Sequence, residues 1–200
     1  MRVLLLLAFT ICPLSLTAQL DDDIIASLRE LDSITQSKIG TPYPDFTATS
    51  LDGKTISEKQ LTGKVTIINF WFEACAPCLA EFDALNDLYH RFKDNPFFQF
   101  LSFTFDSAED AKATACKFNI PYDVFSIADA ECRRLNYKQG FPTTIIIDQS
   151  GKLVFSDHGG LPIKQKRQSR FKHLSKKLQI YSWNCNVKKY ACPKSIDHFY

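Results

Sequence analysis

The chain has 200 residues, with 24 Lys and Arg against 22 Asp and Glu, so its formal net charge is +2. This near balance argues against a nucleic-acid partner, which would need a clear excess of positive charge. The length suits one domain, with room for a small appendage.

The first 18 residues resemble a secretory signal peptide. Arg2 precedes an apolar run from Val3 to Leu16, and the small residues Thr17 and Ala18 follow it. The run is shorter than the roughly 20 residues that span a bilayer, and Ala18 suits the position before a cleavage site. We therefore expect a periplasmic or secreted protein, with an uncleaved membrane anchor as the alternative. Six of the 7 cysteines lie beyond this segment, in a compartment that permits disulfides.

Residues 19–39 are predicted to form an N-terminal helical segment, because apolar residues recur at helical spacing between positions 24 and 34. Gly40, Pro42 and Pro44 then interrupt the pattern. Residues 44–57 predict two short extended pieces around an Asp52-Gly53 turn.

From residue 65 onwards, apolar strands alternate with amphipathic helices. We expect strands over 65–72, 97–106 and 143–148, and a helix from Pro77 to Phe92. Further helices are expected over 108–117 and 131–137, with a short strand between them. A turn at 149–151 should lead into an antiparallel strand over 152–158, and a basic amphipathic helix over 162–180 should follow.

This order predicts an α/β fold with a mixed central sheet flanked by helices. We divide the chain into a signal peptide (1–18), an N-terminal segment (19–39), a main domain (40–180) and a tail (181–200). The charged face of helix 162–180 is expected to contact solvent, with an anionic membrane surface or an acidic partner as the alternative.

The stretch WFEACAPC, residues 71–78, places two cysteines where a buried strand ends and a helix begins. A helix N-terminus stabilises negative charge and thus favours a thiolate, so Cys75 is the candidate nucleophile. Cys78, one helical turn later, could resolve a mixed disulfide formed by Cys75. The pattern therefore favours redox chemistry.

Three other interpretations compete with this one. A zinc site would need two more ligands, but neither a second CxxC nor His residues at ligand spacing are present. A purely structural disulfide would close only a small loop and gain little stability. A peroxidatic cysteine would need the pattern Pro-x-x-x-Thr-x-x-Cys. Ile68 and Phe72 occupy the Pro and Thr positions relative to Cys75.

The runs VTIINFWFEACAPCLAEF (65–82), PDFTATSLDGKTIS (44–57) and GFPTTIIIDQSGKLV (140–154) resemble a known family. They are similar to the extracytoplasmic thioredoxin-like thiol–disulfide oxidoreductases of the TlpA/ResA type, over residues 40–178. The resemblance implies a thioredoxin-like fold, with Cys75 as the attacking and Cys78 as the resolving cysteine. It also implies that Pro142 is a cis-proline facing the cysteine pair, the alternative being an ordinary trans turn.

The resemblance assigns a further role to Glu81, three residues after Cys78, as a carboxyl group that tunes proton transfer at the cysteines. Asn69 occupies the position of the Asp that serves cytoplasmic thioredoxins. The alternative for Glu81 is an exposed helix residue. Ala74 stands where the family commonly has Trp, Glu73 adds a charge, and Phe141 is bulky, so partner choice is expected to differ.

The remaining cysteines leave two questions open. Cys116 and Cys132 either form a second disulfide or are small buried apolar residues, whereas Cys185 and Cys192 are expected to pair locally within the tail.

The sequence as a whole predicts a monomeric enzyme that exchanges dithiols for disulfides with protein substrates and an envelope electron donor, more readily as a reductase. It is expected to need no cofactor beyond its Cys75–Cys78 pair. A thiol peroxidase and a non-catalytic binding module are the alternative functions.

Overall fold

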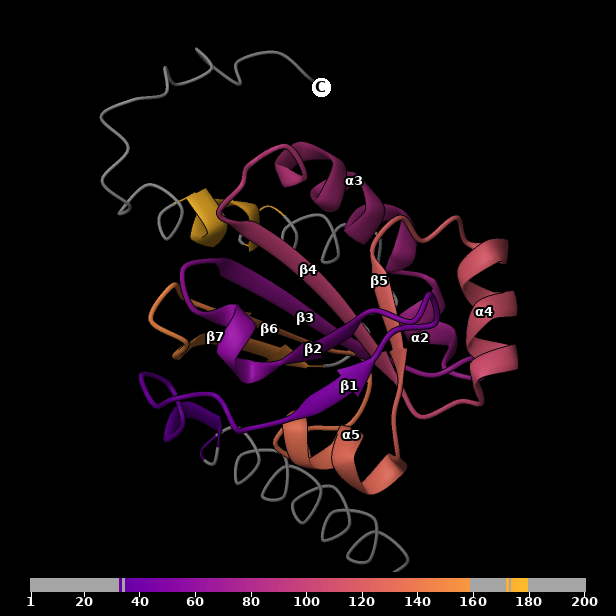
Figure 1. The fold of residues 1–200 in the computed structure, drawn as a ribbon, viewed down its shortest axis with the longest axis horizontal. Coiled ribbons are helices and arrows are strands. Elements are labelled where there is room, and N and C mark those ends of the chain that lie inside the picture. Colours follow the sequence, from indigo (N-terminus) through magenta and orange to yellow (C-terminus); the bar gives the residue numbers. More distant parts are fainter. Residues whose placement is uncertain (1–32, 34, 159–171, 173, 180–200) are drawn as a thin grey trace, which may run out of the picture. The chain divides into compact units, whose positions relative to one another are not determined.

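The structure of the protein is a computed structural model that describes residues 33, 35–158, 172 and 174–179 (Figure 1). The chain forms two compact units, Met1–Lys38 and Ile39–Tyr200, and the second contains every strand of the described part. The described residues leave out the predicted signal peptide, most of the predicted helix in 19–39, and the tail with Cys185 and Cys192.

A five-stranded mixed sheet in the order β5-β4-β3-β6-β7 forms the centre of the second unit (Figure 1). β3 runs parallel to β4 and β4 parallel to β5, whereas β6 is antiparallel to both β3 and β7. The predicted α/β class and mixed sheet are confirmed. The strands are β3 (Val65–Trp71), β4 (Phe98–Thr104), β5 (Asp123–Ser126), β6 (Thr143–Ile147) and β7 (Leu153–His158).

β3 is the middle strand, and all of its residues are buried. A strand that is covered on both faces is expected to be mainly apolar, with no alternation of polar and apolar residues. The sequence of β3 follows this expectation. Parallel neighbours require crossover connections, which the helices between β3 and β4 and between β4 and β5 supply. The ends of β3 and β4 therefore lie at one edge of the sheet.

The helices are α2 (Ala76–Leu79), α3 (Phe82–Phe92), α4 (Ala108–Lys117) and α5 (Asp129–Leu135). The single helix predicted from Pro77 to Phe92 is wrong in one respect, because Ala80 and Glu81 separate α2 from α3. Both residues keep right-handed backbone angles, with ψ values of −11° and −16°. The apolar residues on either side of the break therefore keep their helical spacing. Residues 174–179 are helical, as predicted for that part of 162–180.

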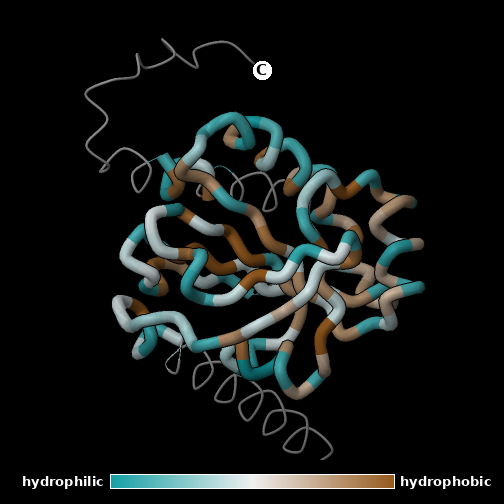
Figure 2. Tube along the Cα trace, in the orientation of Figure 1, coloured by the Kyte–Doolittle hydropathy of each residue, from teal (hydrophilic) through white to brown (hydrophobic). Residues whose placement is uncertain are grey.

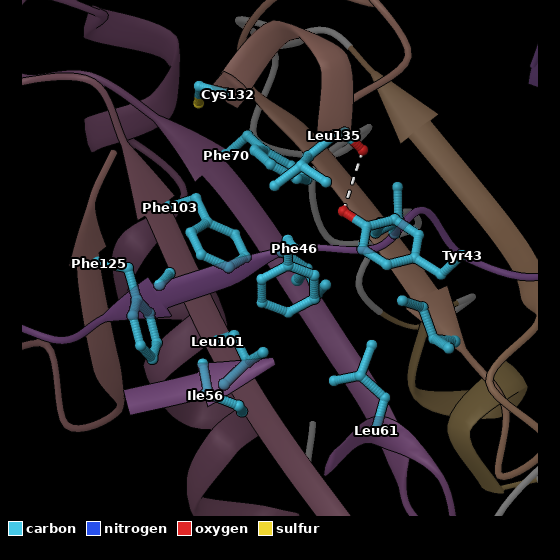
Figure 3. Close-up of a cluster of buried hydrophobic side chains, with 14 of the residues drawn as sticks. Tyr43, Phe46, Ile56, Leu61, Phe70, Leu101, Phe103, Phe125, Cys132 and Leu135 are labelled. Atoms are coloured by element: carbon cyan, nitrogen blue, oxygen red, sulfur yellow. Dashed lines mark hydrogen bonds between the residues drawn. The ribbon is translucent and has the colours of Figure 1, made fainter. Parts of the chain in front are cut away.

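One face of the sheet is covered by α5 and by a hairpin of β1 (Thr47–Thr49) and β2 (Thr55–Ser57), followed by a short 3₁₀ helix, η1 (Glu58–Leu61). The predicted turn is confirmed: Gly53 has a φ of 83°, which glycine adopts without strain. Figure 3 shows the apolar cluster on this face, in which the Tyr43 hydroxyl donates to the Leu135 carbonyl at 3.0 Å.

The opposite face packs against α2, α3, α4 and the helical residues near the end of the described chain. Its buried residues include Trp71, Phe82, Leu174 and Leu178, together with both cysteines of the CxxC motif. Figure 2 shows that the central strands are hydrophobic while much of the surrounding chain is hydrophilic. Among the residues that the structure describes, no helix is both long and apolar enough to span a bilayer.

Candidate active site

Cys75 and Cys78 lie at the edge of the sheet where β3 ends. The Cys75 amide donates to the Phe72 carbonyl at 3.0 Å, which turns the chain into α2. Cys75 is the N-cap of α2, and its Sγ accepts the Cys78 amide at 3.2 Å. Pro77 lies in the first turn, where its missing N–H costs no helical hydrogen bond.

The two cysteines are joined in a disulfide with a Cα–Cα distance of 5.2 Å. Cys75 is 5% exposed and Cys78 is 1% exposed. Both residues are buried, and Cys78 is the more deeply buried of the two. An attacking cysteine is expected to be the more exposed member of such a pair.

Glu81 lies between α2 and α3 and is only 1% exposed. Its amide donates to the Cys78 carbonyl at 3.0 Å, so its backbone is tied directly to the resolving cysteine. The alternative of an exposed helix residue is wrong. A carboxyl group buried within one turn of a redox cysteine is a candidate for proton transfer.

Asn69 lies in the middle of β3 and is 1% exposed. Its Nδ2 donates to Thr144 Oγ1 at 3.1 Å, across the β3–β6 pair. The position therefore holds a neutral amide that bridges two central strands, and Glu81 is the carboxyl-bearing residue nearest to Cys78 along the chain.

The predicted cis-proline is present, since the Phe141–Pro142 peptide bond is cis. Pro142 is buried and leads directly into β6, whose first residue, Thr143, pairs with Phe70 near the end of β3. Asn136 Nδ2 and Thr143 Oγ1 both donate to the Gly140 carbonyl, at 2.9 and 2.7 Å. These bonds fix the proline loop at the same edge of the sheet as the cysteines.

The structure adds Asp106, which the sequence analysis did not single out. Its Oδ2 accepts the amide of Glu73 at 2.7 Å and the hydroxyl of Thr104 at 2.7 Å. Ser126 Oγ donates to the Asp106 carbonyl at 2.6 Å. Asp106 thus links the loop before Cys75 to the ends of β4 and β5. The only signal in the sequence was an acidic residue directly after an apolar strand.

Of the two alternatives left open for Cys116 and Cys132, a disulfide between them is wrong, because both thiols are free. Cys132 is buried among the residues that α5 packs on one face of the sheet, where burial raises its pKa to about 12. Cys116 is exposed on α4, which packs on the other face, so the expectation of a buried side chain is also wrong for it. The sheet separates the two helices.

Within the described ranges, no three His, Cys, Asp or Glu side chains are grouped as a metal site would require.

A cysteine disulfide at a strand-to-helix junction, beside a cis-proline loop on a mixed sheet, defines a thioredoxin-like dithiol–disulfide exchange site. Residues 39–156, more than half of the chain, match the AhpC/TSA family, and the chain belongs to this family.

The chain is also similar to several named proteins. Thiol-disulfide oxidoreductase ResA of Bacillus cereus is 34% identical over 121 residues, which cover 58% of this chain and 68% of that protein. Thioredoxin-like protein YneN of Bacillus subtilis is 30% identical over 134 residues, covering 66% and 77%. A thiol:disulfide interchange protein of the thioredoxin family from Chlorobium tepidum superposes with a TM-score of 0.56 at 26% identity, covering 71% and 96%. The chain is a thiol–disulfide oxidoreductase.

Proposed function

We propose that the protein reduces disulfides in other proteins outside the cytoplasm, with Cys75 as nucleophile and Cys78 as resolving cysteine. The observation that carries this proposal is the position of the pair at the start of α2, where Cys75 is the N-cap and Cys78 is the more deeply buried residue. The export signal expected in residues 1–18 supports the compartment, and the resemblance of the sequence motifs to the TlpA/ResA type favours the direction of reduction.

The reaction begins with the reduced dithiol. The Cys75 thiolate attacks one sulfur of the substrate disulfide, the substrate S–S bond breaks, and the leaving thiolate takes up a proton. The Cys78 thiolate then attacks Cys75 Sγ, which forms the Cys75–Cys78 bond and releases the second substrate thiol. Two electrons and two protons pass to the substrate, and a protein dithiol donor restores the reduced pair.

Glu81 and Pro142 support these steps. Cys78 must lose its proton before it can resolve the mixed disulfide. We assign the buried Glu81 carboxyl, whose backbone amide donates to the Cys78 carbonyl, to accept that proton. We assign Pro142, with its cis bond, to contact the substrate chain beside the cysteines. No cofactor is required, and the monomer contains the complete site.

The test is reduction of insulin disulfides with a dithiol as electron donor. Cys75→Ser should abolish the activity, and Cys78→Ser should accumulate Cys75 in mixed disulfides that can be isolated from the native host. Equal rates for the native protein and Cys75→Ser would overturn the proposal in favour of a non-catalytic binding module.

The direction of electron flow is tested by equilibrium with glutathione. A reductase should have a potential near the roughly −270 mV of thioredoxin, whereas an oxidant would lie near the −120 mV or so of DsbA. Consumption of peroxide with the same dithiol donor would support the thiol peroxidase instead.

A further inference from the structure

Three phenylalanines from separate segments pack on one another at the edge of the sheet that carries the cysteines. Phe72 follows β3, Phe105 follows β4, and Phe141 precedes Pro142. The rings of Phe72 and Phe105 stack with centroids 5.2 Å apart, and Phe141 meets each of them edge-on at 5.4 Å. Each ring contacts both of the others, so they form one aromatic cluster.

The aromatic cluster is continuous with the reactive pair. The Phe72 carbonyl accepts the Cys75 amide, and Phe141 is bonded directly to Pro142. A substrate sulfur that reaches Cys75 therefore brings its neighbouring residues to these rings.

The cluster differs from the core rings on the same strands. Phe70 and Phe103 are fully buried, whereas all three rings of the cluster remain partly exposed. Exposed aromatic surface in contact with water is costly, and its burial by a partner is favourable. The loop between Phe72 and Cys75 contains no aromatic residue, since it consists of Glu73 and Ala74, which are both exposed.

Polar groups border the cluster. The Arg133 guanidinium lies over the Phe141 ring at 5.7 Å and is held by Asp129 at 2.9 Å. Asp106 is engaged with the Glu73 amide. Charged side chains thus lie beside the partly exposed rings, as polar groups surround the apolar core of an interface.

We propose that the cluster of Phe72, Phe105 and Phe141 is a docking site for an aromatic side chain next to the reacting cysteine of a substrate polypeptide. This inference rests on the proposed function, because it assigns the substrate class of the same site. An aromatic occupant fits better than an aliphatic one of equal area, since a fourth ring gains edge-to-face or stacked contacts with rings already arranged in both ways. The aromatic cluster selects substrates by the residues next to their disulfide, whereas the cysteine pair carries out the exchange.

The experiment compares two peptide disulfides whose cysteines are flanked on both sides by Phe or by Ser. For the reduced native protein, kcat/KM should be about tenfold higher for the Phe peptide, mainly through a lower KM. Phe105→Ala should bring this ratio close to one, and Phe105→Leu should leave an intermediate ratio. Phe105 is the variant of choice because it adjoins neither Cys75 nor Pro142.

Phe97→Ala is the matched control. Phe97 immediately precedes β4, at the opposite end of the strand that Phe105 follows, and it is 37% exposed. Its removal should leave the ratio unchanged. Equal kcat/KM for both peptides with the native protein, or a ratio that Phe105→Ala does not alter, would overturn the docking site while leaving the reductase intact. Failure to reduce either peptide would instead count against the proposed function.

Discussion

Glu81 is the residue whose role follows most directly from the burial of its own side chain. We predict that Glu81→Gln lowers the pH of half-maximal Cys78 alkylation in the reduced protein, because loss of a neighbouring negative charge favours the thiolate. It should also slow resolution of the mixed disulfide, since the proton acceptor is lost. Rapid-quench alkylation across pH measures both. Asp83→Asn, an exposed carboxyl in the first turn of α3, is the control, and equal shifts in both variants would refute the assignment.

Asp106 affects the same reaction through its hydrogen bond to the backbone amide of Glu73. We predict that Asp106→Ala lowers kcat/KM for disulfide substrates about tenfold, because the Glu73 amide loses a charged acceptor that holds the loop before Cys75. Asp106→Asn keeps an oxygen acceptor and should retain most of the activity. Asp110→Ala, which removes the carboxylate that accepts the Ser107 hydroxyl at the start of α4, controls for local destabilisation. A loss of activity in Asp110→Ala equal to that in Asp106→Ala would contradict this role.

At the scale of elements, the sequence predicted the strands because each is a dense apolar run between turn residues. The α2–α3 break could not be predicted, since Ala80 and Glu81 retain right-handed angles and the apolar period continues through them. This break nevertheless determines where the Glu81 carboxyl lies. The hairpin at Asp52-Gly53 was predictable because the local turn chemistry specifies it.

Packing of the hairpin on the sheet gives a test at the same scale. Phe46 is 6% exposed and meets Phe103 edge-on at 5.5 Å, at the centre of the cluster in Figure 3. We predict that Phe46→Ala lowers the free energy of unfolding by about 3–5 kcal/mol, as expected for a large cavity in a core. Urea denaturation measures this. Phe97→Ala, at an exposed ring, should change stability by less than about 0.5 kcal/mol. A similar loss in both variants would show that Phe46 does not anchor the hairpin.

At the scale of the whole molecule, the site contains two kinds of residue. Cys75, Cys78, Glu81 and Pro142 were identified from short motifs, since local spacing and the family resemblance are sufficient for them. Asp106 and the aromatic cluster depend on which strand ends lie side by side. The parallel β3–β4 pair and the antiparallel β3–β6 pair bring these segments to one edge, and no local pattern contains that information.

The stability of the whole fold should fall in alkaline solution, because buried acids keep their protons to a higher pH in the folded protein than in the unfolded chain. Burial raises the pKa of Cys132 and of Tyr137 to about 12, from ordinary values of 9.0 and 10.0. The unfolded chain therefore loses these protons first. The stabilisation is complete below pH 9 and is lost as the pH rises towards 12, at up to about 1.4 kcal/mol per pH unit for each group. Tyr137 is more exposed to solvent and contributes less.

Urea titrations of the oxidised protein at pH 8, 9.5 and 11 should show this decline, and Cys132→Ala should make it shallower. An identical slope in Cys132→Ala would mean that the Cys132 thiol already ionises in the folded protein.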